Sequence, residues 1–179
     1  MIACLGWGSL VWDPKKLPIK GEWQNDGPYV PVEFLRQSNN GRLTLVIDPL
    51  SQPMPILWAE LNVCKLSEAV EHLRIREETS CKKIGRWPDA NGYEYENEIG
   101  DWAKSKGING VVWTALGPKF CDEDGRRPSQ GEAIQYLRGL TGNALNLAKE
   151  YVEKAPVQID TDYRRAFTTT LGWKARLQA

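Results

Sequence analysis

The sequence predicts a mixed α+β domain, on three observations. Strand-like segments rich in β-branched and aromatic residues dominate the first third of the chain, and helical patterns follow between and after them. The length of 179 residues is typical of one domain. No repeat, low-complexity segment or linker divides the chain, so we expect residues 1–179 to form a single domain.

Five segments have strand composition and are bounded by turn residues. The first, at 2–5, is apolar throughout, as an inner strand would be. Ser-Asn-Asn-Gly at 38–41 predicts a hairpin between the second and third strands, because Asn-Gly supplies the positive φ that tight turns need. The segments 14–28 and 86–95 are interrupted by proline and glycine and are expected to be loops. The five expected strands are 2–5, 29–35, 42–47, 56–63 and 110–115.

Helices are expected in five places. Ser67 can cap a helix that runs to about Glu78, and Ser129 or Gly131 can open another. Gly172 is placed to end the last helix. The expected ranges are 67–78, 96–105, 132–140, 143–154 and 160–170.

Composition excludes several classes of function. The net charge is zero and the pI is about 6.6, which argues against nucleic-acid binding. No run of 18 apolar residues predicts a membrane span, and no signal peptide is recognisable. The four cysteines form no C-x-x-C pair and are expected to be reduced, so we predict a soluble cytoplasmic protein. His72 is the only histidine, which excludes a two-histidine metal site and disfavours a serine- or cysteine-dependent amidase.

Glu77 is a carboxylate on an apolar helical stripe. Leu66, Val70 and Leu73 define one face of the predicted helix, and the next position on that face is Glu77. Glu78 points about 100° away from it. Glu77 is either a wet residue at a frayed helix end or a partly buried carboxylate with a raised pKa, which could act as a base near neutral pH.

The turn GWGSLVW at 6–12 follows the first expected strand. A dinucleotide fingerprint is excluded, because position 11 is valine where a third glycine is required. The turn resembles the Tyr-Gly-Ser-Leu loop of the gamma-glutamylcyclotransferase-like family, and most closely its ChaC-type, glutathione-degrading branch. Further matching segments follow in the family's order, over about residues 2–140: FLRQS at 34–38, GRLTLV at 41–46, LRIRE at 73–77, ALGP at 115–118 and QYL at 135–137.

This resemblance implies a small, mixed, mostly antiparallel barrel-like sheet surrounded by helices, with a C-terminal helical extension at 150–179. It implies an enzyme in which the α-amine of a gamma-glutamyl group attacks its own side-chain amide and releases 5-oxoproline and an amine. Glu77 would be the catalytic base. The substrate-binding residues would be Trp7, Gly8, Ser9, Leu10 and Tyr136.

The implied reaction needs no metal or cofactor, and its partner is a small gamma-glutamyl compound. Two positions depart from the family pattern: Trp7 replaces a tyrosine, and Glu78 follows Glu77 where glycine is usual. Two alternatives stay open at this point. The chain is either a cyclotransferase or a binding module of the same fold that captures an amino-acid-like ligand without turnover.

Overall fold

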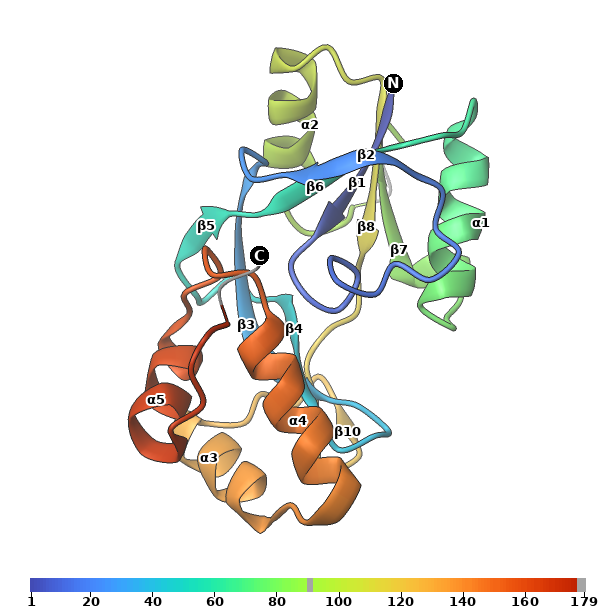
Figure 1. Ribbon diagram of the computed structural model, residues 1–179. Helices are drawn as coiled ribbons and strands as arrows, with labels where there is room; N and C mark the ends of the chain where they lie inside the picture. The colour runs from blue at the N-terminus through green and yellow to red at the C-terminus, as the bar shows by residue number, and fades with distance from the viewer. Residues whose placement is uncertain (90–91, 177–179) are drawn as a thin grey trace. The chain divides into compact units, whose positions relative to one another are not determined.

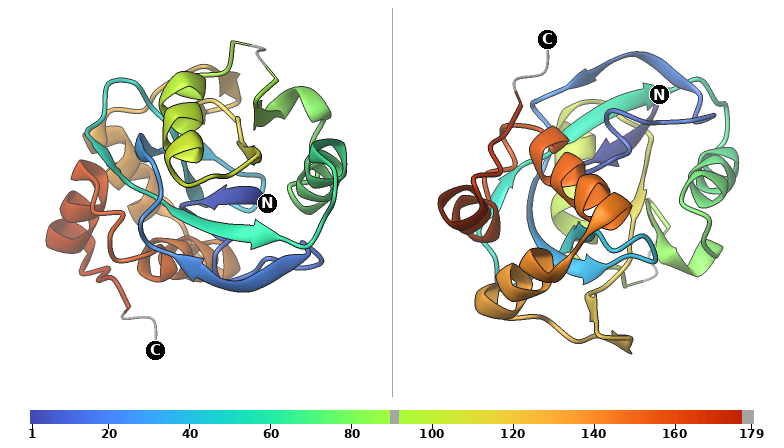
Figure 2. Two further views of the ribbon diagram at one scale, coloured as in Figure 1. Left: turned by 90° about the horizontal axis from the view of Figure 1, so that it is seen from above. Right: turned by 60° about the horizontal axis from the view of Figure 1, so that its bottom comes forward.

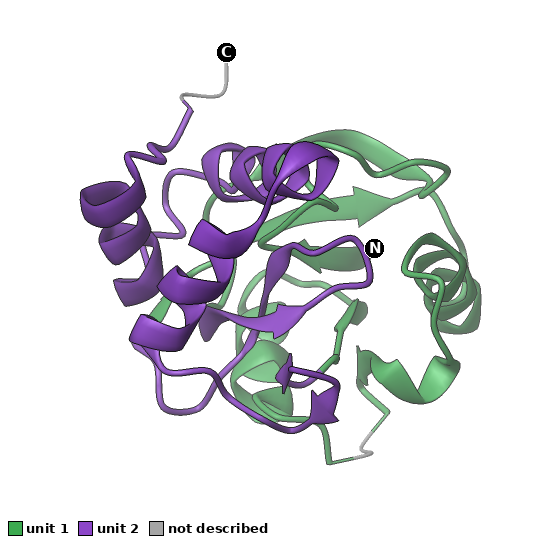
Figure 3. Ribbon diagram, turned by 90° about the horizontal axis from the view of Figure 1, so that it is seen from below, with its two compact units in different colours: residues 1–30, 53–116 green, residues 31–52, 117–179 purple. Residues whose placement is uncertain are grey.

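A computed structural model describes residues 1–89 and 92–176 (Figure 1). The chain forms two compact units, and it passes from one to the other three times (Figure 3). The first unit comprises residues 1–30 and 53–116, and the second comprises residues 31–52 and 117–179. Neither unit is therefore a continuous stretch of chain. That the units fold together as a single domain stays a prediction.

A five-stranded mixed sheet organises the first unit, in the order β2-β6-β1-β8-β7. Strand β1 is central and wholly buried, antiparallel to β6 on one side and parallel to β8 on the other. All five residues of β1 face protein, which is why its sequence is continuously apolar. The strands are β1 (Ile2–Gly6), β2 (Ile19–Gln24), β6 (Leu57–Leu61), β7 (Ile84–Trp87) and β8 (Gly110–Thr114).

Two helices cover the two faces of this sheet (Figures 1 and 2). Helix α1 (Leu66–Arg76) packs on one face, and a 3-10 turn at Cys81–Lys83 leads from it into β7. Helix α2 (Glu96–Ser105) packs on the other face, where a Cβ on Gly100 would come within 2.4 Å of the Trp87 ring. The alternation of side chains along β7 and β8 provides both faces.

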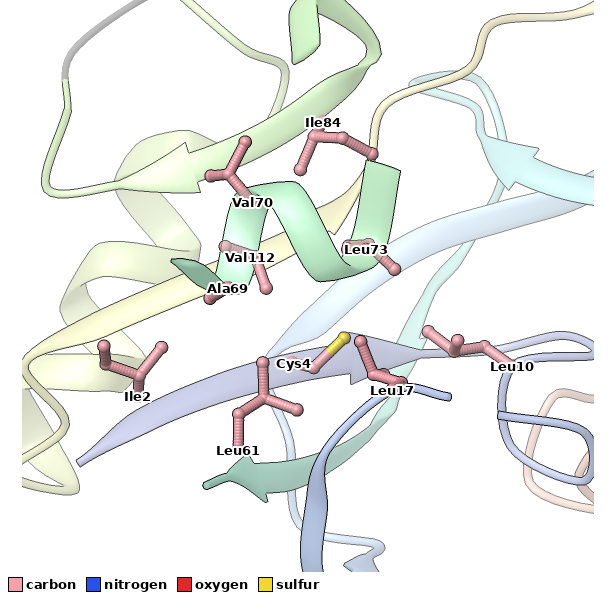
Figure 4. Close-up of a cluster of buried hydrophobic side chains, with 10 residues drawn as sticks. All are labelled: Ile2, Cys4, Leu10, Leu17, Leu61, Ala69, Val70, Leu73, Ile84 and Val112. Atoms are coloured by element: carbon pink, nitrogen blue, oxygen red, sulfur yellow. The ribbon is translucent and has the colours of Figure 1, made fainter. Parts of the chain in front are cut away.

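The core beneath α1 is the apolar cluster that the helical stripe predicts. Ala69, Val70 and Leu73 of α1 share this cluster with Ile2 and Cys4 of β1 (Figure 4). Leu66 packs against the edge of the same cluster. The cluster is completed by Leu10, Leu17, Leu61, Ile84 and Val112. Leu10 lies in the turn after β1 and also belongs to this cluster, so the turn and α1 pack on the same core.

A second mixed sheet belongs mainly to the second unit and follows the order β10-β9-β3-β4. Its main pair is the predicted hairpin of β3 (Tyr29–Gln37) and β4 (Leu43–Ile47), and Gly41 in the connecting turn has a φ of +80°. Two short strands, β9 (Lys119–Phe120) and β10 (Glu123–Asp124), extend it. Its fifth strand, β5 (Pro53–Pro55), also pairs with β3. Residues 29 and 30 at the start of β3 belong to the first unit, as β5 does.

Three helices complete the second unit: α3 (Gln130–Gly139), α4 (Gly142–Lys154) and α5 (Asp162–Leu171). Ser129 caps α3 through a reciprocal capping box with Glu132, and Gly172 ends α5 in the left-handed conformation. The ring of Phe34 on β3 meets those of Tyr151 on α4 and Phe167 on α5 edge to face, with centroids 6.3 and 5.6 Å away.

Two buried charged residues fix α5 in this unit. Arg164 donates to four main-chain carbonyls at and beyond the end of α4, those of Val152, Ala155, Pro156 and Ile159, at 2.5–3.0 Å. Glu33 on β3 accepts from the Thr161 hydroxyl at 2.5 Å and from the Tyr163 amide at 3.2 Å, both at the start of α5. Arg164 of α5 thus binds carbonyls around the end of α4, and the carboxyl group of Glu33 accepts hydrogen bonds from the amino end of α5.

The α+β class is confirmed, and the barrel is not. Within residues 1–89 and 92–176, neither sheet closes on itself. Two strands lie where loops were expected: β2 falls within 14–28, and β7 overlaps the start of 86–95. Ser67 is not the cap of α1, because Lys65 occupies that position and Ser67 lies inside the helix. No helix in the described part of the chain is long and apolar enough to cross a membrane.

Candidate functional site

The turn after β1 is closed by its own backbone. The Val11 amide donates to the Gly8 carbonyl at 3.0 Å, and the Asp13 amide donates to the Ser9 carbonyl at 2.8 Å. Gly6 is required where the strand ends, since a Cβ there would lie 2.7 Å from the Trp23 ring. In residues 1–89 and 92–176, the amides of Gly8, Ser9 and Leu10 donate to no protein acceptor. They form a run of consecutive amides that a small anionic group could occupy.

Helix α1 ends in a Schellman motif, which fixes the backbone of Glu77. The Thr79 amide donates to the Arg74 carbonyl at 3.1 Å, and the Glu78 amide donates to the Ile75 carbonyl at 3.2 Å. Glu77 is the C-cap residue, with φ −85° and ψ −2°. Glu78 occupies the next position with a φ of +52°, where glycine is the usual residue. Glu78 therefore adopts the left-handed conformation that glycine usually adopts after the end of a helix.

The two neighbouring glutamates lie in different surroundings. The Glu77 side chain is 17% exposed, and its Oε1 lies 2.9 Å from Nη1 of Arg76. The Glu78 side chain is 79% exposed and pairs with Lys15 at 3.0 Å. Glu77 is therefore partly buried, as one of the two alternatives held, while the raised pKa of that alternative stays a prediction. The structure adds a guanidinium, which favours the charged form of a carboxylate and opposes the effect of burial.

Arg76 is the residue at this site that the sequence reading missed. Its guanidinium donates to Glu77 Oε1 at 2.9 Å, to Ser9 Oγ at 3.2 Å and, through Nη2, to the Asp13 carbonyl at 2.6 Å. Through this one side chain, the end of α1 is joined to the turn after β1. A signal was present: Arg76 follows Ala69 and Leu73 at helical spacing, so it continues the buried face.

Cys4 of β1 is fully buried, near the charges of Glu77 and Arg76. Burial raises the pKa of its thiol strongly, and the negative charge of Glu77 raises it further, while Arg76 lowers it. The thiol is therefore protonated near neutral pH. A neutral buried thiol is a packing group, not a nucleophile.

The remaining predicted residues are placed as follows. Trp7 is buried, at 5% exposure. Tyr136 belongs to the second unit, on α3, where its hydroxyl donates to the Gly41 carbonyl at 2.9 Å and accepts from the Gln37 amide at 3.2 Å. Its ring meets that of Phe120 edge to face, and partial burial raises its pKa. The structure thus brings together Glu77, Ser9 and Arg76, and shows Tyr136 bonded within its own unit.

No group of three or more histidine, cysteine, aspartate or glutamate side chains suited to a metal ion occurs among the residues that the structure describes. The chain matches no family model, no curated protein and no solved structure.

Proposed function

We propose that this protein is a cyclotransferase that cleaves a gamma-glutamyl amide to 5-oxoproline and a free amine. One observation carries the proposal: a largely buried carboxylate, Glu77, is joined through Arg76 to Ser9. Ser9 lies in a turn whose amides at 8–10 donate to no acceptor within the described part of the chain. The reaction needs a base near an oxyanion-binding turn, and these residues supply both.

The reaction is intramolecular. The α-nitrogen of the glutamyl group forms a bond to its own side-chain carbonyl carbon, and the bond from that carbon to the departing nitrogen breaks. Glu77 accepts a proton from the α-ammonium group and returns it to the departing nitrogen. The α-nitrogen loses a second proton to water as it becomes the ring N–H, and the released amine takes up one from water, so protons balance. The protein mainly has to hold the substrate in a folded conformation, because the nucleophile and the electrophile belong to one molecule.

The turn after β1 would bind the negative charge that develops on the carbonyl oxygen. The amides of Gly8, Ser9 and Leu10 are consecutive and have no protein acceptor among the described residues. Ser9 adds a hydroxyl, and Trp7 would contact the rest of the substrate, as the family resemblance implies. Fixed amide dipoles of this kind stabilise an oxyanion without having to reorganise.

The test is release of 5-oxoproline from a panel of gamma-glutamyl compounds. Replacement of Glu77 by Gln keeps the shape of the side chain but removes its ability to accept a proton, so turnover should fall by roughly 10²–10⁴ while folding is retained. Glu78→Gln is the matched control, because Glu78 is exposed and should be dispensable.

Two results would contradict the proposal. Loss of turnover in Glu78→Gln but not in Glu77→Gln would move the base by one residue. Tight binding of gamma-glutamyl compounds without release of 5-oxoproline would instead identify a binding module.

A further inference from the structure

Arg76 is a buried cation with acceptors on two separate segments. Its side chain is 8% exposed, and its three acceptors are Glu77 Oε1, Ser9 Oγ and the Asp13 carbonyl, the last reached by both Nε and Nη2. Arg74, two residues earlier, pairs with Glu71 at 2.5 Å in a half-exposed position. The two arginines share a helix turn but differ in burial and in partners.

Burying a guanidinium is costly unless hydrogen bonds offset the loss of water. The two-pronged bond to the Asp13 carbonyl would suffice to hold the turn against the helix. The remaining bonds go to Glu77 and Ser9, the base and the hydroxyl of the proposed reaction. The guanidinium is planar and rigid, so acceptors on its different nitrogens are held at a fixed separation.

We propose that Arg76 is a positioning residue that holds the Glu77 carboxylate and the Ser9 hydroxyl in register and keeps Glu77 charged. This inference rests on the proposed function for its catalytic meaning. Ser9 Oγ accepts from Arg76, which directs the hydroxyl hydrogen of Ser9 to donate to another group, such as a substrate oxygen. The positive charge beside Glu77 extends the pH range in which the carboxylate can accept a proton toward lower pH.

The charged and titratable groups near Arg76 and Glu77 include Cys4, Glu78 and Lys15. From β1, the buried Cys4 thiol is neutral and contributes no charge. Next to Glu77 on the chain, Glu78 is exposed and paired with Lys15 from the loop after β1. Exposed pairs of this kind are screened by solvent and act weakly on their neighbours.

The decisive variant is Arg76→Gln, with Arg74→Gln as the matched control. In Arg76→Gln, the acid limb of the pH profile for 5-oxoproline release should move up by about one pH unit or more, because the carboxylate loses its cation. The midpoint of the Glu77 carboxyl carbon signal in a ¹³C NMR titration should move by the same amount, the signal being assigned with Glu77→Gln. Arg74→Gln should move neither.

Arg76→Lys separates charge from geometry and covers the case in which Arg76→Gln does not fold. Lysine keeps the charge but lacks the rigid fork, so the NMR midpoint should stay near that of the wild type while kcat/KM falls by about tenfold or more. An unchanged midpoint in folded Arg76→Gln would overturn the proposal, as would an unchanged kcat/KM in Arg76→Lys. If the wild-type protein turns over no gamma-glutamyl compound, the proposed function fails, and the NMR titration alone decides whether Arg76 keeps Glu77 charged.

Discussion

Glu33 should make the stability of the protein fall as the pH rises from 5 to 8. This carboxyl group is buried at 2% exposure, and its pKa is raised from 4.5 to about 7. Desolvation is the largest cause and raises the pKa, and the charge of Asp162 adds to it. Hydrogen bonds from the Thr161 hydroxyl and from the amides of Phe34 and Tyr163 lower it without offsetting burial.

The sign and size follow from proton linkage. Between pH 4.5 and 7 the folded protein holds a proton on Glu33 that the unfolded chain has lost, so the free energy of unfolding decreases as pH rises and levels off above pH 7. The contribution of Glu33 amounts to about 2–3 kcal/mol between about pH 5 and about pH 8. In Glu33→Gln this contribution should vanish. The bond that glutamine cannot accept from the Tyr163 amide costs the same at both pH values and cancels.

The assay is urea unfolding followed by tryptophan fluorescence, at pH 5 and pH 8, for the wild type and Glu33→Gln. From pH 5 to pH 8, the unfolding free energy of the wild type should fall by about 2–3 kcal/mol more than that of Glu33→Gln. In Thr161→Val, the decline of the unfolding free energy should continue to higher pH than in the wild type, because the charged Glu33 carboxylate loses a hydrogen-bond donor. Thr161→Ser keeps the hydroxyl donor and should behave as the wild type does. Equal pH dependence in the wild type and Glu33→Gln would refute the reasoning.

Three further predictions concern stability and substrate. Arg164→Met should lower the free energy of unfolding by about 3 kcal/mol or more, since it leaves four carbonyls without their donor, whereas exposed Arg165→Met should change it by less than about 1 kcal/mol. Glu78→Gly should stabilise the protein by about 0.5–1 kcal/mol, measured by urea unfolding, because glycine takes the left-handed conformation without strain. Under the proposed function, kcat/KM should be lower for glutathione than for a gamma-glutamyl amide with an apolar or amine leaving group, because Trp7 lacks the hydroxyl of the tyrosine in the family that the sequence resembles. Glutathione ranking first would contradict this.

Local signals predicted the fold best. Asn40-Gly41 fixes a hairpin turn through its own backbone preferences, and Ser129 with Glu132 forms a capping box within four residues, so both could be read without tertiary information. Strand β7 was missed because Pro88 and Gly92 predict a loop over residues 86–95, which overlaps its end. Gly85 within the strand is needed because Trp113 covers it, and a Cβ there would lie 2.2 Å from that ring. Whether a sheet closes depends on pairings between distant strands, which is why the barrel was wrong.

At the candidate site too, local features could be predicted from the sequence and contacts between distant segments could not. The spacing of apolar residues on α1 located Glu77 at the edge of the core, because a helical face is a local property. The spacing from Ala69 and Leu73 also puts Arg76 on a buried face, but the sequence does not show what a buried arginine would bind. Its burial follows from acceptors on Ser9 and Asp13, more than sixty positions away in the sequence. No local pattern could identify those partners.

The central position of β1 has a consequence for how the chain is made. Its register joins Ile2 to Leu61 on one side and to Gly110 on the other. During synthesis from the amino terminus, the buried strand β1 is therefore made before both of the strands that it pairs with. Contacts so distant in sequence form slowly, and an unpaired apolar strand invites association with other chains. Strand β1 is thus an apolar segment that stays unpaired on one side until β8 has left the ribosome.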